Sequence, residues 1–228
     1  MRERPILFSG PMVRAILAGS KTQTRRLVTP WAPRLGVDAV PADVSYLPDF
    51  TCYRATCPGG QPGDHLWVRE AWRSTADLDK HSGSQIADLC LDAGYNVPWA
   101  PIQYEADGAR RDWKHTGTPP HDGPPQPGRY RHARFMPRWA CRLVLEITGV
   151  RVERLQDISY EDALAEGAFD PRMFVGDEWN DADGESADEL ARRLQWPQRA
   201  FRELWCKING AESWDANPWV WIVEFRRI

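Results

Sequence analysis

The chain has 228 residues and a mass of 26.1 kDa, which suits one large domain better than two small ones. Hydrophobic residues make up 42%, charged residues 27%, and the net charge is −3, a globular composition that argues against wholesale disorder. No apolar run approaches the ~20 residues of a membrane helix, and the one after Met1–Pro5 is too short for a secretory signal. Five cysteines, an odd number, form no disulfide framework and predict a cytoplasmic protein.

Charge is unevenly distributed along the chain. Residues 1–34 carry seven basic side chains and one acid, and residues 110–142 form a second basic stretch. Residues 161–190 carry eleven acids and a single base, Arg172. Such segregation would let a mildly acidic protein present a basic face to a phosphate-bearing ligand, and solvated surface is the alternative.

The first half of the chain predicts short elements separated by long loops. A brief strand over residues 5–9 is followed by a helix that Pro11 opens and Gly19 ends. Residues 29–62 are typical of a loop, and residues 65–72 alternate like a strand after the Pro62-Gly63-Asp64 turn. A short strand is expected at residues 102–105 and a loop at 115–128.

The second half of the chain gives the clearest patterns. Residues 141–155 alternate as a long strand, which Gly149 is expected to bend. Ser159 caps a short helix that ends at Gly167, and a last helix runs from Pro197 to Asn209-Gly210. The final strand, residues 219–225, is apolar on both faces and is therefore expected to be buried. Several short strands with scattered helices predict an α+β fold built on a small β-barrel.

One short motif can carry chemistry: Gly19-x-Lys21-x-x-Thr24-x-Arg26. A threonine hydroxyl becomes a nucleophile when a neighbouring base removes its proton, and a lysine whose pKa is lowered by burial and nearby cations can be that base. Arg25 and Arg26 supply the cations. A basic loop whose threonine only bonds backbone is the alternative.

With its surroundings, this motif resembles the ASCH family of the PUA-like superfamily of small barrels. The resemblance covers about a third of the chain and rests on four ordered pieces: residues 15–26, the Gly63-Asp64 turn, the helix end Ala163-x-x-Glu166-Gly167, and the strand 221–225. The whole chain also looks like a longer subfamily encoded by phages and prophages, through residues 63–70, 136–140 and 217–221. Its length implies one domain, residues 1–228, with insertions near 28–61, 73–140 and 168–195.

The resemblance implies an activity. Compact members of the family include amidohydrolases that remove the acetyl group from N4-acetylcytidine, and their lysine, threonine and glutamate fall on Lys21, Thr24 and Glu166. Thr24 would attack the amide carbonyl, Lys21 would move the proton, and Glu166 would orient Lys21. The expected substrate-binding residues are Arg25, Arg26, Gly63, Asp64, Trp67, Arg69 and Glu70, with Trp67 expected to stack on a base although most of the twelve tryptophans are expected in the core.

A metal or organic cofactor has little support in the sequence. Cys52-x4-Cys57 with His65 downstream could begin a zinc site, but no fourth ligand follows at suitable spacing. Phosphate-binding glycine loops and dinucleotide fingerprints are missing, so no cofactor is predicted.

Three functions therefore stay open. The first is hydrolysis of an acylated amino group on a pyrimidine nucleoside or a related nucleic-acid bond. The second is a non-catalytic module, or a ribonuclease-type protein, that uses the same pocket on a nucleoside or single-stranded nucleic acid, RNA before DNA. The third is a phage assembly or host-interaction protein, suggested by the acidic insertion.

Overall fold

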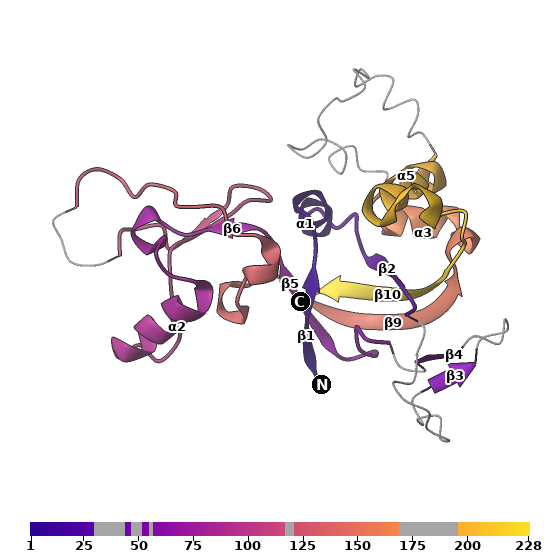
Figure 1. Cartoon of the computed structure of the whole chain (residues 1–228), viewed down its shortest axis with the longest axis horizontal. Coiled ribbons are helices and arrows are strands. Elements are labelled where there is room, and N and C mark those ends of the chain that lie inside the picture. The colour runs from indigo at the N-terminus through magenta and orange to yellow at the C-terminus, as the bar shows by residue number, and fades with distance from the viewer. Residues whose placement is uncertain (30–43, 47–51, 55–56, 117–120, 169–195) are drawn as a thin grey trace, which may run out of the picture.

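The computed structural model describes residues 1–29, 44–46, 52–54, 57–116, 121–168 and 196–228. Their main feature is a five-stranded mixed sheet with the strand order β1-β5-β9-β10-β2 (Figure 1). Only β1 and β5 pair in parallel, and the other three pairs are antiparallel. The strands are β1 (Glu3–Leu7), β2 (Gln23–Leu27), β5 (His65–Arg69), β9 (Val144–Arg154) and β10 (Trp219–Arg227).

The last strand, β10, is an interior strand of the sheet and is largely buried, as its sequence predicts. It pairs with β9 on one side and β2 on the other, and residues 220–223 are all buried because both faces of the strand are covered. The register between β9 and β10 shifts at Glu224/Phe225, opposite Gly149. A Cβ on Gly149 would lie 2.5 Å from the Glu224 carboxylate, so a larger residue at this position would require the Glu224 side chain to move.

Helices cover both faces of this sheet. The helix α1 (Gly10–Leu17) packs on the face that carries Val223 and Phe225. The helices α3 (Tyr160–Ala165) and α5 (Pro197–Asn209) share a hydrophobic cluster with Val220 and Ile222 on the opposite face. The loop between α1 and β2 and the end of α3 are thereby brought together beside β2.

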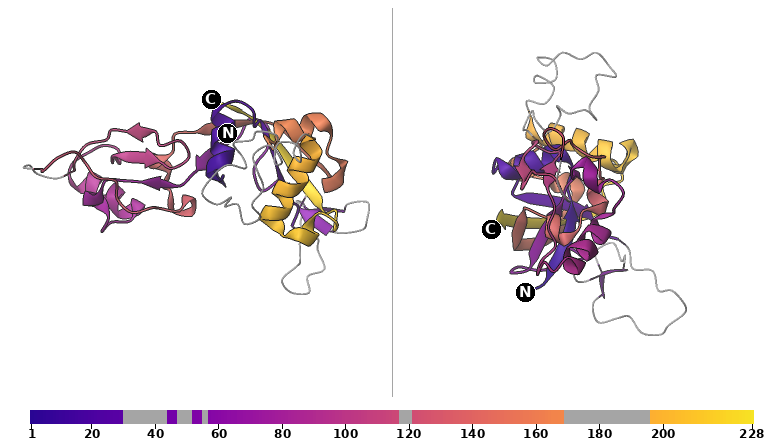
Figure 2. Two further views of the ribbon diagram at one scale, coloured as in Figure 1. Left: turned by 90° about the horizontal axis from the view of Figure 1, so that it is seen from above. Right: turned by 90° about the vertical axis from the view of Figure 1, so that its left-hand side faces the viewer.

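Residues 72–116 and 121–140 form a separate lobe, at the opposite end of the molecule from α5 (Figures 1 and 2). Its core is a small cluster around Trp72, Ile102 and Met136, all fully buried. The lobe contains β6 (Trp72–Arg73), β7 (Ile102–Tyr104), β8 (Arg110–Arg111), α2 (Gly83–Asp92), and the short 3-10 helices Ala76–Leu78, Ala133–Phe135 and Arg138–Ala140. An ion-pair network of the buried Glu70, the half-buried Arg142 and the exposed Asp107 joins the lobe to the sheet.

The described residues confirm the mixed α+β class and the main strands and helices. The sheet they form is open, with β1 and β2 as its edges, so the expected barrel is not closed in this part of the chain. The hairpin of β3 (Val44–Tyr46) and β4 (Cys52–Arg54) lies in a segment predicted as loop, and helix α2 was not predicted. Apart from Ala168, the insertion at 168–195 lies outside the described residues. No described helix is long and apolar enough to cross a membrane.

Candidate functional site

The centre of the candidate site is a buried ion pair between Lys21 and Glu166. Gly19, with φ 76, ends α1, and the chain then leads Lys21 to the C-terminal end of α3, where Glu166 caps the helix. The Lys21 ammonium donates to Glu166 Oε2 at 3.0 Å, to the Glu166 carbonyl at 2.9 Å and to the Gln23 carbonyl at 2.8 Å. These three acceptors match its three protons, so the cation is fully hydrogen-bonded.

Burial governs the ionisation of this lysine. The Lys21 side chain is 1% exposed, and loss of hydration lowers its pKa from the ordinary value of 10.5, although the Glu166 carboxylate opposes the shift. The nearby Arg25 and Arg26 lower the pKa of Lys21 further. Lys21 therefore releases its proton more readily than an exposed lysine does.

A second cation, Arg25, holds the other oxygen of Glu166. Its side chain is fully buried, and it contacts Glu166 Oε1 at 3.2 Å and Asp162 Oδ2 at 2.8 Å. The guanidinium also lies over the Phe201 ring of α5, 5.6 Å from the centroid. Lys21 thus binds one oxygen of the Glu166 carboxylate and Arg25 binds the other, and the two contacts fix the orientation of the carboxylate.

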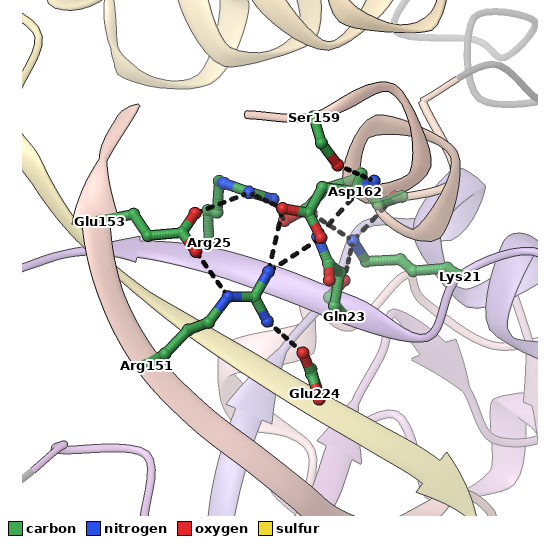
Figure 3. A network of polar contacts seen from close by, with 9 residues as sticks. Lys21, Gln23, Arg25, Arg151, Glu153, Ser159, Asp162 and Glu224 are labelled. Atoms are coloured by element: carbon green, nitrogen blue, oxygen red, sulfur yellow. Dashed lines mark hydrogen bonds and ion pairs between the residues drawn. The ribbon is translucent and has the colours of Figure 1, made fainter. Parts of the chain in front are cut away.

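An outer layer of charges supports this pair (Figure 3). Arg151 of β9 donates to both oxygens of Asp162, at 2.8 and 2.9 Å, and also bonds Glu153 and Glu224. Burial alone would raise the pKa of Asp162, but the hydrogen bonds from Arg151 and Arg25 outweigh it and hold that pKa below 3.8. The Ser159 hydroxyl caps α3 by accepting from the Asp162 amide, which fixes the helix that carries Asp162 and Glu166.

A cavity of about 110 Å³ lies beside the pair, between β2 and α5. Glu166, Thr24, Arg25 and Arg26 line it from one side. Among the described residues the buried Thr24 hydroxyl has no hydrogen-bond partner, so it is available to a ligand. The wall formed by α5 is largely apolar and consists of Phe201, Leu204, Trp205, Ile208 and Asn209, and Met12 of α1 and Leu27 of β2 complete the lining.

Arg26 is the exposed cation of this cavity. Its guanidinium donates to the Leu7 carbonyl at 2.9 Å and lies over the Phe8 ring, 5.6 Å from the centroid. These contacts connect β2 to the end of β1, the two edge strands of the sheet. Because Arg26 is exposed and lines the cavity, its side chain can contact a ligand that enters there.

The structure therefore brings five predicted residues into one place: Lys21, Thr24, Glu166, Arg25 and Arg26. It does not show Lys21 in contact with Thr24, because the ammonium bonds carbonyl and carboxylate oxygens instead. The proton transfer expected between these two residues stays a prediction.

The other predicted substrate-binding residues lie elsewhere. Gly63 and Asp64 form the turn before β5, where the buried Asp64 carboxylate accepts from the backbone amides of Arg2 and Gln61. Arg69 lies over the Trp67 ring at 5.0 Å, and the buried Glu70 pairs with Arg142. β9 and β10 separate β5 from β2, and none of these residues lines the cavity.

The suggested zinc site has no support among the described side chains. No group of three or more His, Cys, Asp and Glu is placed there to hold a metal, and Cys57 has a free thiol. The side chain of Cys52 lies outside the described part of the chain.

Sequence reasoning missed Asp162, Arg151 and the aromatic wall on α5. A signal for Asp162 existed, because it precedes Glu166 by four residues and thus lies on the same side of α3. Phe201 and Trp205 had no comparable signal, since only tertiary packing brings α5 to β2. Comparison with known proteins adds no relative: the chain matches no family model, no curated protein and no solved structure.

Proposed function

We propose that this protein hydrolyses an acylated amino group on a pyrimidine nucleoside or nucleotide, of which N4-acetylcytidine is the model substrate. The observation that carries the proposal is the Thr24 hydroxyl, which lines the cavity without a partner beside the buried Lys21–Glu166 pair. This combination supplies a nucleophile, a proton carrier and a group that orients the carrier. The apolar wall with Phe201 suits the flat face of a base.

The proposed reaction has two halves. Thr24 Oγ attacks the acyl carbonyl while its proton passes to neutral Lys21, and the C–N bond breaks as Lys21 returns that proton to the departing amine. Water then attacks the Thr24 ester and loses a proton to Lys21, and as the acyl C–O bond breaks Lys21 passes that proton to Thr24 Oγ, which releases the carboxylic acid and restores the hydroxyl and the neutral lysine. Glu166 keeps the amine of Lys21 in place throughout.

The hydrogen bonds of Lys21 set a condition for this reaction. Lys21 must lose one proton and turn its neutral amine from one of these three acceptors toward Thr24 Oγ before it can take the threonine proton. Of the three acceptors, the Gln23 carbonyl is the nearest in the chain to Thr24. A small shift of β2 at this point would break that contact and let the Lys21 amine reach Thr24 Oγ. Ligand binding in the cavity is the event that we expect to cause it.

The second candidate is a binding module without catalysis. The saturated ammonium of Lys21 favours it, because a cation with three good acceptors can be purely structural. The cavity would then recognise a nucleoside or a single-stranded nucleic acid, and Arg26 at its rim would contact a phosphate.

The proposal also covers the fold family and the cellular location of the protein. We assign the five-stranded sheet with α1, α3 and α5 to an ASCH-type, PUA-like barrel extended by the lobe, and we place the protein in the cytoplasm. The support is the position of the motif: Gly19 ends α1, Lys21 and Thr24 lead into β2, and Glu166 ends α3, in the order that the resemblance implies.

The experiment is incubation of the protein with N4-acetylcytidine and a panel of other acylated nucleosides, followed by chromatography. The expected result is conversion of at least one substrate to the free nucleoside. Absence of turnover with every substrate, together with measurable binding of the same nucleosides, would favour the binding module.

A further inference from the structure

A compact group of aromatic and basic side chains lies on the lobe, far from the cavity. We call it the tip cluster, and it consists of Trp99, Arg110, Trp113 and Lys114. The Arg110 guanidinium lies 4.6 Å from the Trp113 ring centroid, and the Lys114 ammonium lies 4.7 Å from that of Trp99. Both cations are exposed, and both rings are half-buried.

Local backbone geometry builds this cluster. Arg110 belongs to β8, and Asp112 two residues later has φ 52, a left-handed conformation that turns the chain. The turn ends the strand alternation, so Trp113 lies beside Arg110. The Asp112 carboxylate accepts from the Trp99 indole at 3.1 Å, which ties the second ring to the same turn.

The two cations of the tip cluster have no carboxylate partner among the described residues. The acids nearest to them in the chain are held in other contacts: Asp107 accepts from Arg142, and Asp112 accepts from Trp99. Arg110 bonds only a neutral oxygen, that of the Gln103 amide at 2.9 Å. Both positive charges therefore stay available to an anionic partner.

Three other arginines of the basic stretch are held in internal contacts. Arg131 is buried and donates to the carbonyls of Leu78 and His81, and Arg138 pairs with Glu3. Arg142 pairs with Glu70 and Asp107. These three arginines hold the lobe together or join it to the sheet, which leaves the tip cluster as the better candidate for ligand contact.

We infer that the tip cluster binds single-stranded nucleic acid. Alternating cations and aromatic rings suit this polymer, because the cations meet its phosphates while rings and guanidinium planes stack on unpaired bases. A duplex would offer the phosphates but keep its bases stacked and out of reach. The surface is separate from the cavity, so the inference stands whether or not the cavity is catalytic (Figures 1 and 2).

The test is fluorescence anisotropy with labelled twelve-nucleotide oligo(U) and oligo(dT), and with a duplex of the same length, over a series of salt concentrations. The decisive variant is the double substitution R110Q/K114Q. Both residues are exposed, so the fold should survive. The matched control is R226Q/R227Q, which removes two exposed charges from the end of β10.

The wild type should bind a single strand more tightly than the duplex. R110Q/K114Q should weaken this binding about ten-fold and lower the salt slope by about 1.4, since each phosphate contact contributes ~0.7 for single strands. The control should change neither quantity. The inference is overturned if no oligonucleotide binds, if the duplex binds as well as the single strand, or if both double variants behave alike.

Discussion

Two buried glutamates among the described residues, Glu166 and Glu70, are paired with cations, and they differ in that Glu166 lines the cavity beside β2 whereas Glu70 does not. Glu166 shares its oxygens between Lys21 and Arg25 and lines the space between β2 and α5. Glu70 receives both of its ion-pair contacts from Arg142, at 2.8 and 2.9 Å, at the joint between sheet and lobe. A buried ion pair is thus insufficient to indicate a site, and the adjacent cavity with an unpartnered hydroxyl makes the difference.

The cations also differ in what they can do. Arginine stays charged, and its planar fork suits a fixed bidentate contact such as that between Arg142 and Glu70. Lysine can lose its proton, and burial lowers the pKa of Lys21. Burial instead raises the pKa of Glu70 despite the arginine beside it. We therefore interpret the Glu70 pair as structural and the Glu166 pair as the one able to exchange protons.

The largest expected contrast is kinetic. Glu166→Gln should lower the turnover of an acylated nucleoside about 10³-fold, because Lys21 loses the charge that orients it for proton transfer. Glu70→Gln should leave turnover within about two-fold of wild type wherever both proteins are folded, since Glu70 does not line the cavity. Steady-state rates, with folding checked by circular dichroism, compare the two. Equal losses would remove the distinction between the pairs.

A second contrast concerns stability and its pH dependence. Each of the two substitutions should cost about 2–4 kcal/mol of unfolding free energy at pH 7, because a buried cation loses its carboxylate. The Glu166 carboxylate opposes the lowering of the Lys21 pKa, so its removal should lower that pKa further. Between the Lys21 pKa of the variant and that of wild type, the folded variant binds fewer protons than folded wild type, so its stability should rise with pH relative to wild type.

The deficit of Glu166→Gln relative to wild type should accordingly shrink toward alkaline pH. The deficit of Glu70→Gln should not shrink, since Arg142 cannot deprotonate. Urea unfolding of the three proteins at pH 7 and pH 9.5 measures both deficits. A constant deficit in Glu166→Gln would mean that Lys21 does not titrate in this range.

Asp162 offers a smaller effect at acid pH. Its lowered pKa means that its ionised form stabilises the fold above about pH 4, and that this stability is lost as pH falls through the folded-state pKa. Asp162→Asn should therefore cost about 1–2 kcal/mol at pH 7 and less at pH 3, because wild type loses part of the same contribution once the pH is below the unfolded-state pKa. Thermal unfolding at the two pH values tests this, and an equal cost at both would contradict it.

The smallest effect is expected at the rim of the cavity. Arg26→Gln should raise KM for a nucleotide substrate about five-fold and leave kcat nearly unchanged, because an exposed guanidinium can bind the phosphate without touching the acyl group. The matched change Arg202→Gln, also an exposed arginine but on α5 and not lining the cavity, should alter neither constant. A fall in kcat alone would assign Arg26 to the chemical step.

The sequence predicted those parts of the fold that depend on local patterns. Alternation identified β9 and β10, and Gly19 and Gly167 predicted the helix ends near Lys21 and Glu166, whereas only the resemblance placed these two residues beside each other, where the structure has them. The helix α2 was missed, although Ser82 and Gln85 form the capping box that marks its start. The lobe, the open edges of the sheet and the α5 wall of the cavity depend on contacts between distant segments, which no local pattern contains.

The substrate-binding residues show the same limit. Arg25 and Arg26 lie next to the motif and were found, but Gly63, Asp64, Trp67, Arg69 and Glu70 were grouped with them only because the resemblance implied it. Their strand, β5, lies three positions from β2 in the sheet. The order of strands is set by pairing between distant segments, and it separates the residues around β5 from those of β2, which the sequence prediction had placed in one site.

The central claim is that the Thr24 hydroxyl is the nucleophile of this site. The most direct measurement is the turnover of N4-acetylcytidine by Thr24→Val, which keeps the shape of the side chain and removes only the hydroxyl, beside wild type and Thr24→Ser. The account predicts turnover by wild type and by the serine variant, and none above background by the valine variant. Full activity in Thr24→Val would contradict the covalent mechanism and leave a lysine-activated water in its place.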